Sequence, residues 1–428
     1  MTVFDYIPAL IRLLFVFIIV IVCVRKKISL GNSFFLGAIG LGLVFGLNPS
    51  GMVRSILSSF IAPKTFALAV IVSLILVLSN SMEMTGQMKK LLENFKGLVK
   101  NSRLNIIVFP ALIGLLPMPG GAVFSAPMVK ELGAGTAYTP ARLSYINYWF
   151  RHVWEYWWPL YPGILLIAVI AEKSILSIMM VQGPLTLFVL FAGYFYLEKQ
   201  NGSPAEDSAH KISTGAMPFL KELLPVLMVI FLGIGTGIFL SYAFPKFNLG
   251  IETGLIFALI LAIMNVWFTH QMTASEMRKI LINPQMLKMI YMIFAILVFK
   301  GMLEDSHAVG AVTRELVFLN IPLLLIVAIL PFLVGLITGI TIAFVGSAFP
   351  ILIPLVASLD PAGNLLSYLM LAMVCGFAGV LMSPVHLCLI LSNEYFGVSM
   401  GSVYRYLWKP CLYLVIMGFV YFYILKLY

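Results

Sequence analysis

Residues 104–131 read LNIIVFPALIGLLPMPGGAVFSAPMVKE, an apolar segment that is interrupted near its centre by PMPGG at positions 117–121. A second apolar segment, at 323–356, is interrupted in the same way by TGIT at 338–341. Backbone N–H and C=O groups that such breaks set free need partners, because lipid offers none. We therefore expect both segments to form re-entrant hairpins, in which two helical arms enter the membrane and return to the same side.

The rest of the chain has the composition of an integral membrane protein. Of its 428 residues, 61% are hydrophobic and 10% are charged, whereas a soluble globular chain carries about 25% charged residues. Apolar stretches of about 20 residues recur from end to end, the length that a helix needs to cross a ~30 Å hydrocarbon core. The strict alternation of a transmembrane β-barrel is absent. The sequence predicts an all-α integral membrane protein.

Ten further apolar stretches are candidate transmembrane helices. They lie near residues 8–24, 28–47, 65–84, 144–171, 174–196, 219–244, 250–268, 286–303, 363–393 and 405–427. If both interrupted segments are hairpins, 18 of the 27 lysine and arginine residues fall in loops on one side, which the positive-inside rule assigns to the cytoplasm. We expect a multi-pass protein with both termini outside. The formal charge of +10 then reflects topology, and we expect no nucleic-acid partner.

An internal repeat runs through the chain. Glu83 and Glu304 stand 221 residues apart in similar surroundings, and the pattern Pro-x-x-x-Gly occurs at 110–114 and again at 331–335 with the same offset. Equivalent points are separated by five spans, an odd number, so the second copy should be inverted relative to the first. The expected units are a first repeat at 1–197, a polar cytoplasmic linker at 198–216 and a second repeat at 217–428.

Inverted repeats with interrupted segments at matching positions are typical of secondary transporters, whose substrate site lies where the interruptions meet. The alternative is that the glycines and prolines only kink helices or allow close packing. Because two broken segments occur at equivalent places in the two halves, we favour the functional interpretation.

The hairpin tips are the first part of the expected site. Backbone N–H groups at helix N-termini can hold an anion, and an arginine can bind a carboxylate through two parallel hydrogen bonds. The expected substrate-binding residues are Pro119, Gly120, Gly121, Ser125, Arg151, Thr338, Gly339, Thr341, Ser347 and Ser383.

The stretch NYWFRHVWEYWW at 147–158 places ionisable side chains next to a membrane-length apolar run. Arg151 and Glu155 are four residues apart, so on a helix they would share a face and could form an ion pair. His152 could carry a proton near neutral pH. Alternatively, the tryptophans form part of an interfacial aromatic belt and Arg151 extends to the membrane surface. Because helix-breaking prolines follow directly, we expect a wall of the site.

The second copy has a similar break at Ser383-Pro384, followed by His386 and Asn393. The expected coupling residues, for a proton or sodium, are His152, Glu155, His386 and Asn393.

Other kinds of chemistry find little support in the sequence. The cysteines at 23, 375, 388 and 411 are solitary, so we expect no metal site, no disulfide and no cofactor. Metal-binding His-Glu-x-x-His, nucleophile-elbow and Gly-Lys-Ser/Thr phosphate-loop motifs are absent, so we expect neither an intramembrane enzyme nor an ATP-driven pump. A channel remains the main alternative to a carrier.

The motifs LPMPGGAVFSAPMV and NYWFRHVWEYWWPLYPG together resemble the family called domain of unknown function 401, over nearly the whole chain. That family is grouped with the ion transporter superfamily, alongside gluconate permeases and dicarboxylate and citrate carriers. The resemblance implies a prokaryotic inner-membrane protein with a scaffold domain, a mobile transport domain, hairpins that meet tip to tip and an elevator-like motion, often in a homodimer. Dicarboxylate carriers have Ser-Asn-Thr at their tips, whereas this chain has Pro-Gly and Thr-Gly. The coupling ion is therefore left open between proton and sodium.

These observations predict an ion-coupled symporter of a small organic anion, a carboxylate, that works in the lipid bilayer.

Overall fold

The structure is a computed structural model that describes residues 6–95, 102–118, 120–134, 136–195, 197, 216–244, 246 and 249–427. These residues form helices and no β-strand, so the predicted all-α class is confirmed. Pro119, an expected site residue, and residues 198–215 of the expected linker lie outside the described part of the chain.

The helices before the expected linker begin with four longer elements, and the seven that follow are shorter. They are α1 (Ala9–Arg25), α2 (Leu30–Val44), α3 (Pro49–Ile61), α4 (Pro63–Met84), α5 (Gln87–Phe95), α6 (Ser102–Ile113), α7 (Ala122–Gly133), α8 (Pro140–Arg151), α9 (Pro162–Ile170), α10 (Ile175–Gln182) and α11 (Leu185–Phe195).

The helices after it include several long ones. They are α12 (Ala216–Ala243), α13 (Gly250–Thr269), α14 (Ala274–Leu281), α15 (Pro284–Asp305), α16 (Ala308–Phe318), α17 (Leu323–Thr338), α18 (Thr341–Leu359), α19 (Leu365–Leu381), α20 (Leu387–Phe396) and α21 (Met400–Lys426).

Seven helical stretches of the described chain are long and apolar enough to cross a membrane. They are Pro63–Met84, Ile175–Tyr194, Ala216–Ala243, Gly250–Thr269, Ala274–Asp305, Thr341–Leu359 and Met400–Lys426. Three of the ten predicted spans, 144–171, 174–196 and 363–393, are each divided into two shorter helices, although the gap within 174–196 is only two residues. The exact number of spans stays a prediction.

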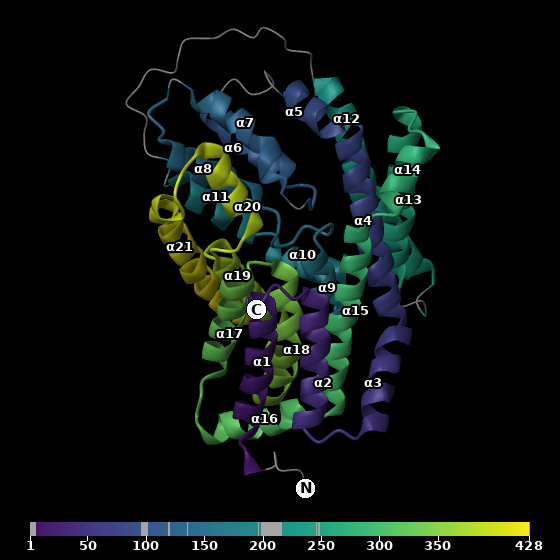
Figure 1. Cartoon of the computed structure of the whole chain (residues 1–428), viewed down its shortest axis with the longest axis vertical. Coiled ribbons are helices and arrows are strands. Elements are labelled where there is room, and N and C mark those ends of the chain that lie inside the picture. Colours follow the sequence, from purple (N-terminus) through teal and green to yellow (C-terminus); the bar gives the residue numbers. More distant parts are fainter. Residues whose placement is uncertain are drawn as a thin grey trace.

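Both interrupted apolar segments form pairs of helices. In the first, α6 ends at Ile113 and α7 begins at Ala122. In the second, α17 and α18 are separated only by Gly339 and Ile340. The pair α6–α7 lies toward one end of the molecule and the pair α17–α18 toward the other, with the 151–162 segment between them (Figure 1). Their re-entrant position in a membrane stays a prediction.

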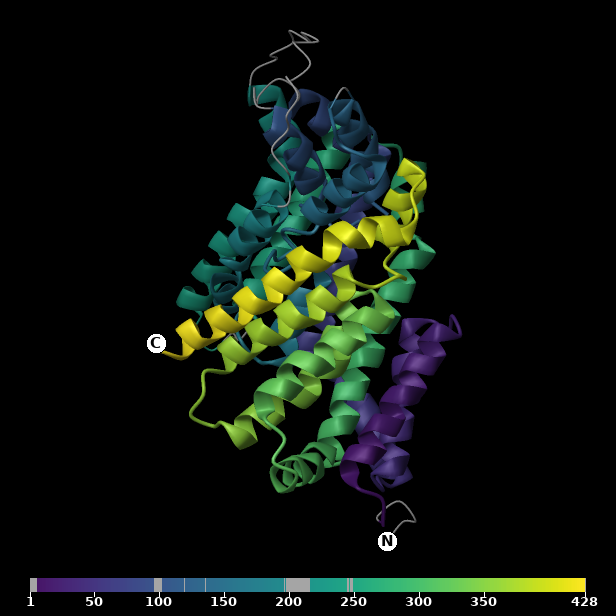
Figure 2. The same ribbon diagram turned by 90° about the vertical axis from the view of Figure 1, so that its left-hand side faces the viewer.

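The helices gather into two groups. In one group α12 packs along α13, α13 contacts α4, and α15 packs against α2, α3 and α4. In the other, the α6–α7 and α17–α18 pairs pack against α8, α9, α19 and α20, and α21 crosses the outside of this group (Figure 2). The groups meet where α15 contacts α18 and α4 contacts α9.

One glycine in each pair brings the first arm against the neighbouring broken helix. A Cβ atom on Gly114 would collide with the backbone oxygen of Arg151, and a Cβ atom on Gly335 would collide with that of Gly376. These are the glycines of the two Pro-x-x-x-Gly patterns. The inverted repeat itself stays a prediction.

Candidate functional site

The break between α8 and α9 supplies hydrogen-bond donors to the end of α6. Trp154 Nε1 donates to the Ala111 carbonyl at 2.8 Å, and Trp158 Nε1 donates to that of Leu115 at 2.9 Å. The Tyr161 hydroxyl donates to the Gly114 carbonyl at 2.6 Å. A helix leaves its last carbonyls without intrahelical partners. The aromatic side chains therefore satisfy the backbone groups that the first break exposes.

The remaining two tryptophans of this stretch also donate within the protein. Trp149 Nε1 bonds the Val189 carbonyl at 3.0 Å, and Trp157 Nε1 bonds Thr186 Oγ1 at 2.7 Å. Trp149 is fully buried. All four indole N–H groups thus bond within the protein, and the role of the stretch as a wall of the site stays a prediction.

Arg151 is the last residue of α8 and its side chain is 3% exposed. Its Nη2 donates to the Met118 carbonyl in the first tip at 2.6 Å. A Cβ atom on Gly121 would lie 2.7 Å from the guanidinium, so the missing side chain makes room for it. Within the described residues, Nε and Nη1 have no hydrogen-bond partner. The guanidinium therefore retains donors that could hold an anion.

Glu155 joins the same segment to the second hairpin. Thr341 Oγ1, at the start of α18, donates to Glu155 Oε2 at 3.3 Å. His152 Nε2 lies 3.7 Å from Glu155 Oε1. The expected ion pair between Arg151 and Glu155 is not formed in the described chain, because α8 ends at Arg151 and the residues that follow form turns.

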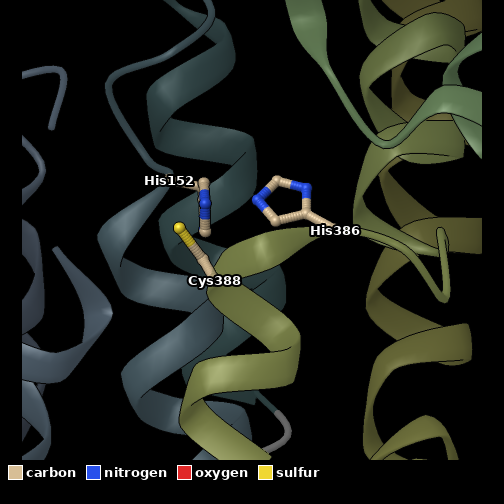
Figure 3. Close-up of side chains that lie close together, drawn as sticks. All are labelled: His152, His386 and Cys388. Carbon is tan, nitrogen blue, oxygen red and sulfur yellow. The ribbon is translucent and has the colours of Figure 1, made fainter. Parts of the chain in front are cut away.

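The two histidines lie side by side although they come from different halves of the sequence. The rings of His152 and His386 are 4.9 Å apart and nearly perpendicular. Cys388, two residues beyond His386, lies against both rings (Figure 3). The structure thus joins two predicted residues with a cysteine to which the sequence assigned no role.

A buried polar network fixes the helices around the site. Ser125 donates to Asn147 Oδ1 at 2.6 Å, and Asn147 Nδ2 donates to Ser392 Oγ at 2.9 Å. Ser144 donates to Asn393 Oδ1 at 2.7 Å. These bonds connect α7, α8 and α20. Sequence reasoning selected Ser125 and Asn393 and missed the residues between them.

The tip glycines adopt left-handed backbone conformations that side chains disfavour. Gly120 has φ of +74° and Gly339 has φ of +65°. A Cβ atom on Gly120 would approach the Leu391 side chain. A Cβ atom on Gly339 would lie 2.9 Å from Ser383 Oγ and 3.0 Å from the backbone nitrogen of His386. Both tips therefore contact the region around the 381–387 break and α20.

The other expected hydroxyls are engaged locally. Thr338 Oγ1 donates to the Val334 carbonyl and Ser347 Oγ donates to the Ala343 carbonyl, both at 2.8 Å. Ser383 Oγ accepts a hydrogen bond from the Val385 nitrogen at 3.4 Å. Thr338 and Ser347 could offer only acceptor lone pairs to a ligand.

Comparison with known proteins gives a family and a fold. The sequence profile described as "Protein of unknown function (DUF401)" matches residues 9–425. A comparison with curated proteins finds no match. Among the solved structures with a similar fold is that of the Alcanivorax borkumensis YdaH transporter, described as having an unusual topology. It shares 14% sequence identity at a TM-score of 0.57, covering 87% of this chain and 89% of that one.

Proposed function

This chain belongs to the DUF401 family, and we propose that it is a secondary active transporter of a small organic anion, a carboxylate. The observation that carries the proposal is Arg151. A buried guanidinium needs hydrogen-bond acceptors or a counter-charge, yet Arg151 keeps two nitrogen atoms without a hydrogen-bond partner among the described residues. A carboxylate could accept from Nη1 and from the second hydrogen of Nη2, which point the same way at the end of the guanidinium.

The position of Arg151 supports transport rather than a static binding role. The segment 151–155 contacts the first tip through Met118 and the second through Thr341. An anion held at Arg151 would therefore affect both hairpins, which lie toward opposite ends of the molecule (Figure 1). Movement of either hairpin would open the site toward one end.

The two groups of helices suit an elevator-like motion. The group with α12, α13, α4 and α15 would act as the scaffold, and the group with both hairpins would move as the transport domain. The resemblance to the ion transporter superfamily implies this division, and the fold shared with the YdaH transporter supports a transport role in general.

A carrier is favoured over the alternative, a channel, by the burial of the ionisable groups. Arg151, His152, Glu155 and His386 are 3%, 1%, 9% and 7% exposed, respectively. A permanently open pore would expose the groups that line it to water. A closed site instead requires a conformational change for each molecule that passes.

Coupling to a cation, either a proton or sodium, is part of the same proposal. Glu155 places a carboxylate oxygen at the second tip, beside Thr341, and Asn393 has a buried amide oxygen that accepts from Ser144. Oxygen is the usual ligand of hard cations. Uptake into proteoliposomes driven separately by an imposed sodium gradient and by an imposed pH gradient distinguishes the two ions.

A thermal-shift screen of the purified protein against small organic acids, with and without sodium, tests the proposal. A ligand stabilises the state that it binds, so the true substrate should raise the unfolding temperature in proportion to the logarithm of its concentration. The proposal is contradicted if no carboxylate raises the unfolding temperature of the protein.

Arg151→Lys is the matched variant for the ligand that the screen identifies. Lysine keeps the charge but cannot reproduce the planar two-pronged contact, so the dissociation constant should rise about 10- to 100-fold, the loss of roughly 1.5–3 kcal/mol expected for a hydrogen bond to a charged group. The control is Arg54→Lys on α3, whose arginine is exposed and far from the tips. Equal affinity in the wild type and Arg151→Lys would contradict the assigned role.

A further inference from the structure

His152, His386 and Cys388 form a cluster of three metal-binding side chains. One ligand atom from each lies within 4.8 Å of those from the other two. Their exposed fractions are 1%, 7% and 7%. Figure 3 shows a ring nitrogen of His386 facing His152, with the Cys388 sulfur beside the His152 ring. The three groups come from two broken helices that are far apart in the sequence.

The hydrogen bonding of His152 prepares it to be a ligand. Its Nδ1 lies 2.6 Å from the Tyr148 carbonyl. A carbonyl can only accept, so Nδ1 carries the proton and Nε2 of the neutral ring keeps its lone pair. A carbonyl that orients a histidine in this way is the usual outer partner of a metal ligand. Nε2 itself has no hydrogen-bond partner among the described residues.

Simple packing is the competing explanation, because buried cysteines and stacked rings are common in protein interiors. It leaves a cost unexplained. His152 Nε2 is buried without a hydrogen-bond partner in the described chain, and such an atom costs about 1–3 kcal/mol. A metal ion at the centre of the cluster would directly satisfy the His152 nitrogen and the sulfur, and would orient the His386 ring.

We propose that His152, His386 and Cys388 bind a thiophilic metal ion, Zn²⁺ or Cu⁺. Imidazole and thiolate ligands select these ions over Mg²⁺ and Ca²⁺, which prefer oxygen. Zn²⁺ takes four ligands, so a water molecule or a shifted Glu155, whose Oε1 is 3.7 Å from His152 Nε2 but which lies outside the cluster of three, would have to supply the fourth. Cu⁺ is satisfied by three, and with the Cys388 thiolate it forms a neutral site next to the positive charge of Arg151.

Binding would join the end of α8 to the start of α20. The metal would replace the thiol proton of Cys388, which is released to solvent. The site would therefore fasten the first predicted repeat to the second beside both hairpin tips. This proposal is independent of anion transport, because metal binding can be measured in purified protein without any transport assay.

The test measures metal bound to the purified full chain. After incubation with Zn²⁺, or with Cu⁺ under anaerobic reducing conditions, followed by removal of free metal, the wild type should retain about one ion per chain. Cys388→Ser, which nearly preserves size, and His386→Asn should lower the affinity at least about 10- to 100-fold in competition with a chromophoric chelator. Cys375→Ser and Cys411→Ser are matched controls, because both cysteines are buried outside the cluster, and both should bind like the wild type.

Co²⁺ gives an independent readout that a packing role would not produce. Co²⁺-loaded wild type should show a thiolate-to-cobalt charge-transfer band, which Cys388→Ser should abolish and Cys411→Ser should retain. Thermal unfolding of each metal-free variant confirms that it is folded. The proposal is wrong if folded wild type binds neither Zn²⁺ nor Cu⁺ more tightly than Cys388→Ser. That result would leave the Arg151 proposal intact, since anion binding is measured separately.

Discussion

Gly121 has no side chain at the point where the guanidinium of Arg151 crosses the first tip. Its φ of −55° suits any residue, so an alanine there would act through space rather than through backbone strain. Its Cβ atom would lie 2.7 Å from the guanidinium and would displace it. We predict that Gly121→Ala weakens anion binding about tenfold or more while the protein remains folded, measured by ligand-dependent thermal shift.

The control for this substitution is Gly235→Ala on α12. No atom lies within 4 Å of the Cβ that it would add, and alanine is the better helix former. It should leave binding unchanged and stability equal or higher. Normal anion affinity in Gly121→Ala would show that the guanidinium does not need this space.

Single residues were predictable when their type was unusual for the membrane. Arg151, His152, Glu155 and His386 stand out in the sequence because ionisable groups are costly in lipid, and the structure gathers them together. Cys388 does not stand out, since a cysteine in an apolar run reads as a small hydrophobic residue. Only the His-x-Cys spacing just after a proline break gave a signal, and its meaning depends on a histidine more than 200 residues away.

The end of α6 shows how elements depend on one another in this fold. Trp158 and Tyr161 donate to carbonyls that α6 leaves free. We predict that Trp158→Phe lowers the free energy of unfolding by about 1–3 kcal/mol, because the Leu115 carbonyl loses its donor while most of the aromatic contact remains. A reduced unfolding midpoint in detergent measures the effect.

Trp408→Phe on α21 is the matched control, because Trp408 is 48% exposed. The wall interpretation predicts a clear difference between the two substitutions. Equal and small effects would instead favour an aromatic belt for the 147–158 stretch.

Long apolar helices were predictable to within a few residues, and so were the breaks at 117–121 and 338–341. The short helices α3, α5, α14 and α16 were not, because a search for membrane-length apolar runs passes over mixed sequences. Local signals were present: Thr273 and Glu276 form a capping box at the start of α14. The possible ion pair between Arg151 and Glu155 is not formed because it requires a helix through Glu155, whereas α8 ends four residues earlier, at Arg151.

At the scale of the whole molecule, the inverted repeat predicts that equivalent helices lie on opposite sides of the membrane. Lys89 on α5 and Phe318 on α16 are both exposed. In a background with Cys23 replaced by serine, a membrane-impermeant maleimide should label Lys89→Cys from the cytoplasm and Phe318→Cys from outside. The three native cysteines that remain are buried. Labelling of both positions from one side would refute the inverted arrangement.

The arrangement of the two hairpins could be predicted only in outline, because the sequence gives the breaks but not what fills them. The 221-residue offset indicated that the breaks should meet. The hairpins are joined through Arg151, Glu155 and the region around the 381–387 break. These contacts depend on how α8 and α20 pack, and no local sequence pattern specifies that packing.

Entrance counterflow in proteoliposomes is the most direct test of the account, which holds that Arg151 binds an organic anion in a site closed to both sides. Vesicles are loaded with the unlabelled carboxylate found by thermal shift and diluted into a trace of the labelled one. A carrier should accumulate label transiently, with saturation, and Arg151→Lys should reduce this at least about tenfold at low substrate concentration. Label that only equilibrates without overshoot, or counterflow that is unchanged in Arg151→Lys, would contradict the account.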